Sequence, residues 1–128
     1  AEAGVGARVD IRHYVAEEDL DTLYASAAVF VFLSEYEGFG LTPLEALSAH
    51  VPIVVLDTPI AREVYGEAAW YVPAEADVAH AAQAIKALLD DASSADRILK
   101  AAPDVLARYS WTTAADETLA GIERAARA

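Results

Sequence analysis

One short stretch limits most strongly what this chain can fold into: an apolar run, then two glycines, then the start of a helix. The run is Ala28–Leu33, the glycines are Gly38 and Gly40, and helical spacing begins at Thr42. Runs that are apolar throughout, rather than at alternate positions, are typical of strands covered on both faces of a parallel sheet. The stretch therefore predicts a strand, a glycine turn and a helix, as in doubly wound α/β domains.

The same alternation continues on both sides of this stretch. Short apolar runs predict further strands at Val9–Ile11, Pro52–Leu56 and Trp70–Val72. Helical spacing predicts helices at Glu17–Ala27, Thr42–Ala49, Ala76–Leu89, Ser93–Ala107 and Ser110–Ala126, with Ser93 and Ser110 as N-caps of the last two. The chain is thus expected to form one α/β domain over residues 1–128, a Rossmann-like doubly wound parallel sheet closed by C-terminal helices.

Composition narrows the partners of such a domain. The 128 residues suit one domain, and 55% are hydrophobic while 23% are charged, which excludes a disordered tail. The formal net charge is −12 with only 9 Lys and Arg residues, so the protein should repel nucleic acid and anionic membranes. A phosphate group, if one binds, must be held mainly by backbone N–H groups or by a few local cations.

Several features disfavour metal chemistry and membrane insertion. The chain has no cysteine, and its three histidines, His13, His50 and His80, lie far apart in sequence, so no metal site is expected. No apolar run approaches the roughly 20 residues that a transmembrane helix needs, and the N-terminus does not have the layout of a signal peptide. We therefore expect a cytoplasmic protein without a transmembrane segment.

The glycine turn is the segment with the clearest chemical capability. Gly38 and Gly40 let the backbone pass close to a ligand, and the first N–H groups of the following helix lie at its positive end. In an open parallel sheet such a turn faces the crevice beyond the carboxyl ends of the strands. We expect an anion site here, which an acidic protein could use for a diphosphate.

Two glutamates flank the glycines, and each has two interpretations. Thr42, Pro43 and Glu45 have the spacing of a capping box, with Thr42 as N-cap and Pro43 at the first helical position. Glu45 then has either this structural role or a role in binding a ligand. Glu37 is either a solvated loop acid or a carboxylate that accepts hydrogen bonds from sugar hydroxyls.

The segment from Ser34 to Leu47, with two glutamates around Gly-Phe-Gly, closely resembles the acidic signature of the group 1 glycosyltransferases. The resemblance continues through Val15–Tyr24, Ala49–Val55, Ile60–Glu63 with the following Gly66, and Tyr109–Trp111. It covers the chain from about Val9 to the C-terminus. This family consists of retaining enzymes of the GT-B type, and the matched part implies their C-terminal, donor-binding domain.

The resemblance implies a role for each matched residue. Glu37 would be catalytic, contacting hydroxyls of the transferred sugar on the face where the glycosyl cation develops. Glu45 would bind the ribose hydroxyls, and Val15 would border the nucleobase. The sugar and the diphosphate would be held by Gly38, Phe39, Gly40, Leu41 and Thr42. The implied reaction transfers a sugar from a nucleotide-sugar donor to an acceptor with retention, and requires no metal ion or other cofactor.

The chain departs from the family pattern at several positions. His13 and His50 stand where the family usually has glycine. At His50 we expect a structural role, as a left-handed residue that ends a helix, whereas His13 could narrow the base pocket. The family's arginine and lysine that contact the diphosphate have no counterpart here, because Arg12 and Arg62 lie outside that motif and are expected to be surface residues.

Strand order suggests a truncated domain. In the usual order of a doubly wound sheet, Val9–Ile11 would have no neighbour and Ala28–Leu33 would expose an unpaired apolar edge. Because such edges seek partners, we expect either a fragment or a homo-oligomer that exchanges strands. A fragment of this kind lacks the N-terminal acceptor domain and is expected to be inactive alone.

Two alternatives to a donor-binding part of an enzyme remain. The chain could be a non-catalytic nucleotide-binding or interaction module derived from the same fold. It could also be a glycoside hydrolase that uses Glu37 and Glu45 as its acid pair, but that function explains neither the helix start at Glu45 nor the glycine turn.

Overall fold

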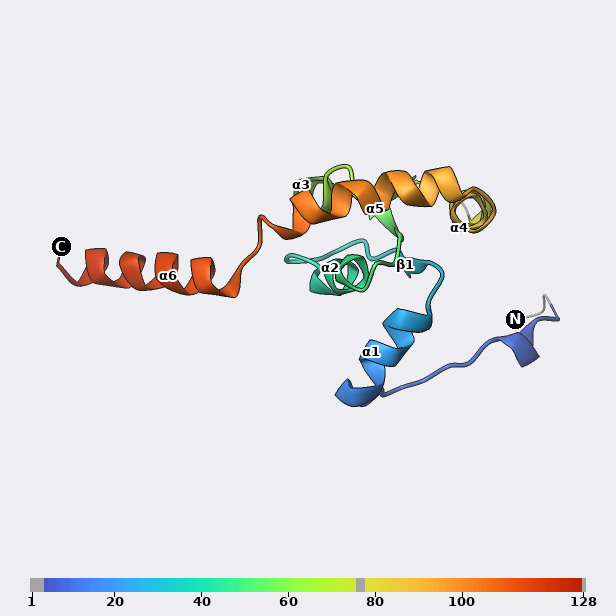
Figure 1. Cartoon of the computed structure of the whole chain (residues 1–128), viewed down its shortest axis with the longest axis horizontal. Helices are drawn as coiled ribbons and strands as arrows, with labels where there is room; N and C mark the ends of the chain where they lie inside the picture. Colours follow the sequence, from blue (N-terminus) through green and yellow to red (C-terminus); the bar gives the residue numbers. More distant parts are fainter. Residues whose placement is uncertain (1–3, 76–77, 128) are drawn as a thin grey trace.

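The computed structural model describes residues 4–75 and 78–127 (Figure 1). Strands and helices alternate through the first part of the chain, and helices alone follow. In chain order the elements are η1 (Gly6–Arg8), α1 (Glu17–Ser26), β1 (Phe30–Phe32), α2 (Leu41–Ser48), β2 (Ile53–Asp57), α3 (Pro59–Tyr65), β3 (Trp70–Pro73), α4 (Val78–Asp90), α5 (Ala92–Leu106) and α6 (Trp111–Ala126). The helix predicted from Ala76 begins, within the described residues, at Val78, and Ala76 and Asp77 themselves lie outside them.

Three of the predicted strands form one parallel sheet in the order β1-β2-β3. In its register, Phe30 pairs with Ile53 and Val54 pairs with Trp70. Parallel neighbours need a crossover, and α2 and α3 supply the two connections. The α/β, Rossmann-like class predicted from the sequence is confirmed.

The prediction of a further strand at Val9–Ile11 is wrong. These residues follow η1 as an extended segment outside the sheet, and the side chains of Val9 and Ile11 are 57% and 77% exposed. A strand is stabilised by ladder hydrogen bonds with a neighbour. Within the described residues, the sheet ends at β1 on this side, so the segment has no strand beside it.

The two apolar runs of the sheet differ in how they are covered. In β2, the successive residues Ile53, Val54 and Val55 are all at most 1% exposed, so both faces of this strand are packed. In β1, Val31 is 38% exposed while its two neighbours in the strand are half-buried. The expected cover on both faces therefore holds for β2 and is wrong for β1, which forms an edge of the sheet.

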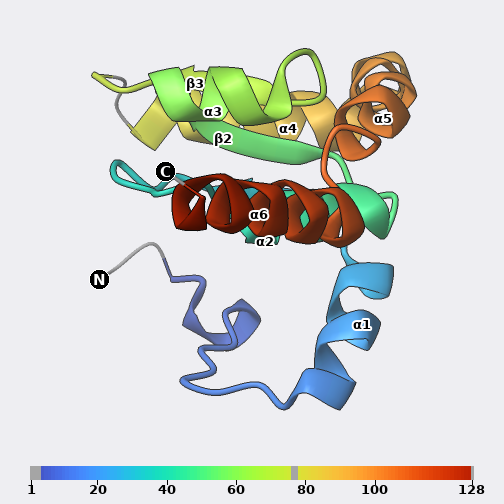
Figure 2. The same cartoon turned by 90° about the vertical axis from the view of Figure 1, so that its left-hand side faces the viewer.

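The helices build a core around β2. Figure 2 shows β2 running between α2 and α3, and both helices contact it, as does α4. Helix α5 packs in turn against α2, α3 and α4. Its Ile98 is fully buried and joins the same core as Ile53. Burial of this apolar surface is the main force that holds the sheet and these helices together.

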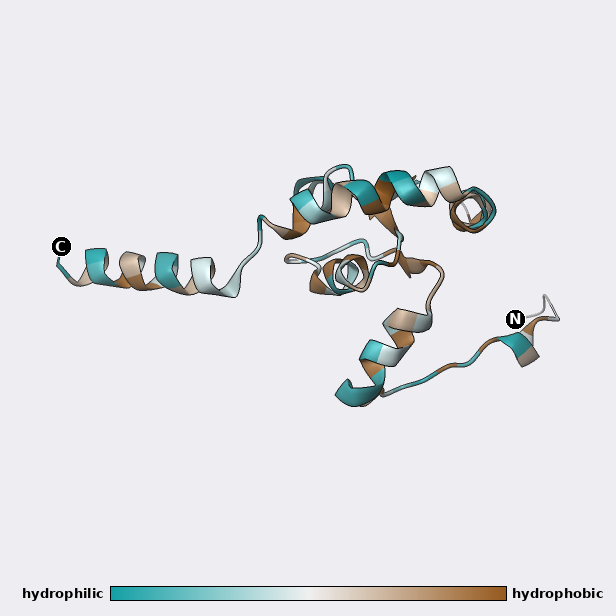
Figure 3. Cartoon of the chain, viewed as in Figure 1, coloured by the Kyte–Doolittle hydropathy of each residue, from teal (hydrophilic) through white to brown (hydrophobic). Residues whose placement is uncertain are grey.

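Helix α6 extends away from this core (Figure 1). Ser110 caps it as predicted, since the Ser110 Oγ accepts a hydrogen bond of 3.4 Å from the Thr113 N–H. Apolar residues recur along α6 (Figure 3), and among them Leu119 and Ile122 are 56% and 61% exposed. Within residues 4–75 and 78–127, no helix has both the length and the apolar character that crossing a bilayer requires.

The starts of α3 and α5 differ from the sequence prediction. Helix α3 is absent from that prediction, although Thr58 and Pro59 form a start signal: the Thr58 Oγ1 accepts from the Ala61 N–H at 3.2 Å, and Pro59 lies in the first turn. Helix α5 begins with Asp91 as N-cap rather than Ser93, because the Asp91 carboxylate accepts from the Ser93 N–H at 3.0 Å. Short helices escape periodicity because they contain too few turns.

The end of α2 explains why His50 is tolerated in place of glycine. His50 has φ 63°, and its N–H and that of Val51 donate to the carbonyls of Leu47 and Ala46, as in a left-handed helix C-terminus. The predicted structural role is confirmed. Left-handed backbone costs a non-glycine residue about 1–2 kcal/mol. A glycine would avoid this cost, but part of the gain would be offset because glycine loses more conformational entropy on folding.

We expect His50→Gly to raise the free energy of unfolding by about 0.5–1 kcal/mol, measured by urea denaturation. Ser48→Gly is the matched control, because Ser48 is still helical and glycine there should instead cost about 0.5 kcal/mol. Equal destabilisation by both variants would contradict the assigned backbone strain.

Candidate functional site

The glycine turn lies at the carboxyl ends of two neighbouring strands. It leaves β1 after Phe32 and enters α2 at Leu41. Glu37, half-buried, lines a small hollow together with residues from the end of β2 and from α3, including Thr58 and Tyr65. The hollow holds only about 10 Å³, roughly one water. The predicted position of the turn, beyond the strand ends, is thus the observed one.

Gly40 is the residue in this turn whose conformation is most constrained. Its φ of 82° is left-handed, and the Tyr65 hydroxyl donates a hydrogen bond of 2.8 Å to its carbonyl. A Cβ at this position would lie 2.2 Å from the Tyr65 Oη. Glycine is therefore required here both by the backbone angle and by the space that the tyrosine occupies.

Tyr65 is a site residue that the sequence reasoning missed. It is 2% exposed, and burial, followed by the negative charge of Glu37, raises the pKa of its hydroxyl to about 12. The hydroxyl therefore stays protonated and remains a donor to Gly40 throughout the neutral range. No local sequence signal marks it, because the contact joins residues 25 positions apart in the chain.

The start of α2 differs from the predicted capping box. Gly40 is the N-cap, and among the described residues no side chain caps the helix, so Thr42 is the second helical residue and Pro43 the third. The predictions of Thr42 as N-cap and of Pro43 at the first position are wrong. Proline fits because the first N–H groups of a helix lack intrahelical acceptors in any case. The N–H groups of Leu41 and Thr42 lie in this first turn.

Glu45 has a partner other than the helix start. The Tyr24 hydroxyl, from α1, donates to its Oε2 at 3.0 Å. Burial and then this hydrogen bond raise the pKa of Tyr24 to about 12. Both residues line a groove of about 550 Å³ between α1 and α2, which also includes Glu17 and Asp21. The structural interpretation of Glu45 as part of a capping box is thus excluded, and its carboxylate faces a groove.

The structure brings together only some of the predicted site residues. Glu37 and Phe39 share the small hollow, whereas Glu45 lines the groove on the side of α1. Gly38 lies in open space, with no atom of the described part of the chain within 4 Å of where a Cβ would lie, and Thr42 is exposed. Val15 is half-buried just before α1 and lines neither hollow. Glu37 and Glu45 therefore do not form one acid pair.

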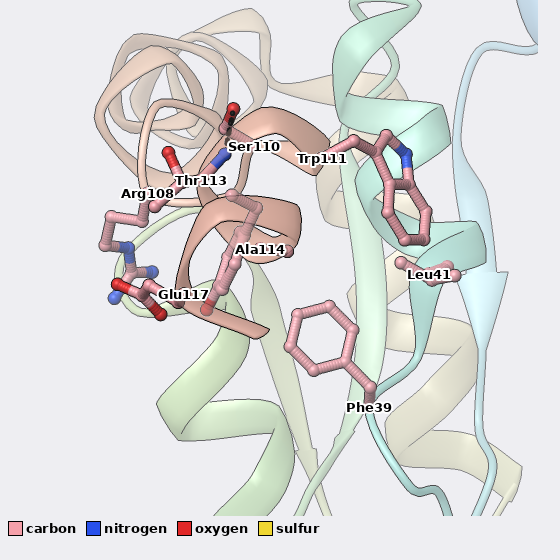
Figure 4. A pocket seen from close by; sticks show the side chains of 9 residues that line it. Phe39, Leu41, Arg108, Ser110, Trp111, Thr113, Ala114 and Glu117 are labelled. Carbon is pink, nitrogen blue, oxygen red and sulfur yellow. Dashed lines mark hydrogen bonds between the residues drawn. The ribbon is translucent and has the colours of Figure 1, made fainter. Parts of the chain in front are cut away.

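A third hollow lies between the turn and α6 (Figure 4). It holds about 380 Å³, and its lining includes Phe39 from the turn, Leu41 at the start of α2, Tyr109 just before α6 and Trp111 at its start. The Phe39 and Tyr109 rings meet edge to face with their centroids 5.0 Å apart. Sequence reasoning noted the aromatic residues 109 and 111 only as part of the resemblance.

The two arginines near the matched segments, Arg62 and Arg12, already have acidic partners. Arg62 makes two hydrogen bonds of 2.7 Å to the Asp57 carboxylate and lies 3.7 Å above the Tyr71 ring. Arg12 pairs with Asp10 at 2.8 Å. The side chains of Arg12 and Arg62 are 51% and 53% exposed, which confirms both as surface residues.

The Asp57–Arg62 pair makes stability depend on pH. The hydrogen bonds from Arg62 lower the pKa of the Asp57 carboxyl below its ordinary value. The pair therefore stabilises the fold above the ordinary carboxyl pKa of about 4, and this contribution is lost as the pH falls through the lowered folded-state pKa. Because the pair is largely exposed, we expect it to contribute only about 0.5 kcal/mol.

Urea denaturation of the protein and of Asp57→Asn at neutral pH and at about pH 3 would measure this contribution. The difference in unfolding free energy between the two should shrink at the lower pH. Asp10→Asn is the control, since Asp10 pairs with Arg12 outside the folded core. A difference that grows on acidification would contradict the assignment.

The chain is similar to known proteins in its sequence. The family model described as Glycosyl transferases group 1 matches residues 1–105. The O-antigen chain mannosyltransferase B of Escherichia coli is 44% identical over 78 residues, which are 61% of this chain and 20% of that protein. The MMP alpha-(1->4)-mannosyltransferase of Mycolicibacterium hassiacum is 33% identical over 132 aligned positions, 98% of this chain and 31% of that protein.

A solved structure shares the fold. The sucrose-phosphate synthase of Thermosynechococcus elongatus superposes with a TM-score of 0.81 at 25% identity, covering 98% of this chain and 32% of that one. The chain thus spans between a fifth and about a third of the length of these proteins.

Proposed function

The chain belongs to the group 1 glycosyl transferases, and from this premise we propose that it forms the donor-binding part of an enzyme that transfers a sugar from a nucleotide-sugar with retention. The observation that carries the proposal is the glycine turn at the carboxyl ends of β1 and β2, with Gly40 held in a left-handed conformation by Tyr65. Ligands of open α/β sheets bind at such strand ends.

The turn and the start of α2 would hold the diphosphate. Gly38 and Gly40 let the backbone approach the ligand, and the N–H groups of Leu41 and Thr42 lie at the positive end of α2. This mode of binding uses few cations, in keeping with a chain of net charge −12. No metal ion or further cofactor is part of the proposal.

Glu37 would act on the transferred sugar. Its hollow is too small for a sugar ring, so the ring would lie over it, with the carboxylate accepting hydrogen bonds from ring hydroxyls. A fixed negative charge beside the anomeric carbon stabilises positive charge that develops there as the bond to the diphosphate breaks. Phe39 borders the same hollow and would limit the room for the sugar.

Glu45 would bind the ribose hydroxyls in the groove between α1 and α2. Tyr24 orients its carboxylate by one hydrogen bond, which leaves the other oxygen, Oε1, for the ligand. Val15, before α1, would border the nucleobase.

An acceptor-binding domain outside this chain completes the proposed enzyme, since the relatives are at least about three times as long. We place the enzyme in the cytoplasm because the chain has no cysteine.

Titration of the chain with UDP, GDP and ADP, followed by calorimetry, tests the donor site. Loss of a hydrogen bond to a carboxylate typically costs about 1.5–3 kcal/mol, so Glu45→Ala should weaken nucleotide binding about 10–100-fold. Glu37→Ala should leave the nucleoside diphosphate affinity unchanged and weaken binding of the nucleotide-sugar that carries the preferred base.

Glu35→Ala is the matched control, since Glu35 is an exposed glutamate of the same loop. It should change neither affinity. Absence of binding by all three nucleotides, or an equal effect of Glu35→Ala and Glu45→Ala, would contradict the proposed donor site.

A further inference from the structure

We propose that the hollow between the glycine turn and the start of α6 is a subsite for a neutral sugar ring of the acceptor. This inference rests on the proposed function, because it places the acceptor beside the donor site that the turn forms. The hollow holds about 380 Å³, a volume within the usual range for small-molecule sites.

The two sides of this acceptor subsite differ in chemistry (Figure 4). Phe39, Leu41 and Trp111 make an apolar wall, while Arg108, Thr113 and Glu117 lie on the opposite side. A pyranose ring has the same division, with C–H groups on its faces and hydroxyls around its edge. The apolar wall would stack on a face of the ring, and Thr113 and Glu117 would hydrogen-bond hydroxyls.

The apolar wall is exposed to an extent that core packing does not explain. The Trp111 side chain is 81% exposed, Leu41 49% and Phe39 37%. Clustered exposed apolar side chains on a protein surface mark binding sites. Trp111 also begins α6, whose own described residues contribute none to the core.

The base of the subsite is nevertheless held firmly. The Arg108 guanidinium donates to the Val64 carbonyl at 2.8 Å and to the Glu63 carbonyl at 3.4 Å, and the Tyr109 hydroxyl donates to the Val64 carbonyl at 3.2 Å. These bonds anchor the segment before α6 to the end of α3. The Tyr109 ring in turn meets Phe39 edge to face. The aromatic wall is thus tied to the turn that forms the donor site.

Charge favours a neutral sugar over a nucleotide or a phosphate. The Arg108 guanidinium is already bonded to carbonyls of α3, and Glu117 adds a negative charge to the opposite side of the subsite. With a net charge of −12 on the chain, a phosphate would be repelled here. A neutral sugar ring is not repelled by this negative charge.

Phe39 connects the subsite to the chemistry. It lines both this hollow and the small hollow of Glu37. A ring stacked on Trp111 would therefore be separated from the proposed sugar position by one side chain. An acceptor hydroxyl must approach the anomeric carbon, and a subsite at this distance orients the acceptor for that approach.

Tryptophan fluorescence gives a direct test. The chain has two tryptophans, and Trp70→Phe leaves Trp111 as the sole emitter. In this background, titration with methyl α-mannopyranoside in the presence of the nucleoside diphosphate found to bind should shift the emission to the blue, with a Kd on the order of 1–10 mM. Saturation-transfer NMR should show the C–H protons of one face of the ring closest to the protein.

Variants separate the subsite from the donor site. Trp111→Ala should reduce sugar binding at least about tenfold and Trp111→Phe should restore most of it, while both leave nucleotide binding unchanged. Leu119→Ala, at an exposed position farther along α6, is the control and should change neither. Circular dichroism confirms that each variant keeps its helices.

Three results would overturn the inference while nucleotide binding stays intact. The first is the absence of sugar binding, and the second is sugar binding that Trp111→Ala does not change. The third is a blue shift that depends on protein concentration together with a dimer in sedimentation, which would make this face a contact between copies. Loss of nucleotide binding itself would instead contradict the proposed donor site.

Discussion

Replacing Gly40 with alanine is expected to lower the free energy of unfolding by about 3 kcal/mol. Left-handed backbone costs an L-residue about 1–2 kcal/mol, and Gly40 has φ 82°. The new Cβ would also lie 2.2 Å from the Tyr65 Oη, and overpacking of this kind costs about 1–3 kcal/mol. Urea denaturation of the two proteins measures the difference.

The same variant should weaken nucleotide binding. Relief of the overlap requires either the turn or the buried Tyr65 to move, and either movement shifts the N–H groups at the start of α2. Because binding depends on the direction of these donors, we expect calorimetry to show a loss of about tenfold or more for the nucleoside diphosphate.

Two controls isolate the cause. Gly38→Ala lies two residues away in open space and should change stability by less than about 0.5 kcal/mol. In a Tyr65→Phe background the Oη is absent and the nearest remaining ring atom, Cζ, lies 3.5 Å from the Cβ position, so Gly40→Ala should cost only its backbone part. An unchanged cost in that background would show that the overlap contributes nothing.

Replacing Ile98 with alanine is expected to cost about 4 kcal/mol, more than the Gly40 substitution. Ile98 is 0% exposed and belongs to the core that α5 shares with α2, α3 and β2. Removing a buried side chain of this size costs about 2–5 kcal/mol, more where the surroundings cannot collapse. Helices pack around this site on several sides, which favours the upper half of the range.

Ile122→Ala is the matched control, because it makes the same substitution on a helix at a side chain that is 61% exposed. It should change stability by less than about 0.5 kcal/mol, since little apolar area is lost and alanine is the better helix former. Equal costs at the two positions would mean that α6 is packed in solution, contrary to its extended position in Figure 1.

Much of the fold was predictable because apolar periodicity reports burial. The run around Val54 indicates a strand packed on both faces, and this strand is the centre of the sheet. The run Val9–Ile11 looks similar by residue type but forms no strand, since a strand depends on a neighbour that composition does not report. Strand exchange at the β1 edge stays a prediction.

In the candidate site, too, the features that depend on local sequence could be predicted, whereas those that depend on distant contacts could not. The glycine turn, its place after β1 and its family resemblance could be read from residues 34–47, because each depends on local backbone chemistry. The true N-cap of α2 could not be predicted in this way. The spacing of a capping box suggests Thr42, whereas the structure has the left-handed Gly40, two residues earlier, as the N-cap. That choice of N-cap coincides with a contact to Tyr65, which periodicity does not report.

The class of fold, the order of most elements and the family of the chain could all be predicted from the residues alone. These follow from periodicity and from one contiguous motif. The contacts between Tyr65 and Gly40 and between Tyr24 and Glu45, and the hollow shared by Phe39 and Trp111, could be seen only in the folded chain. Each of these pairs lies more than 20 positions apart in the chain, so whether its members meet depends on how the helices pack around β2.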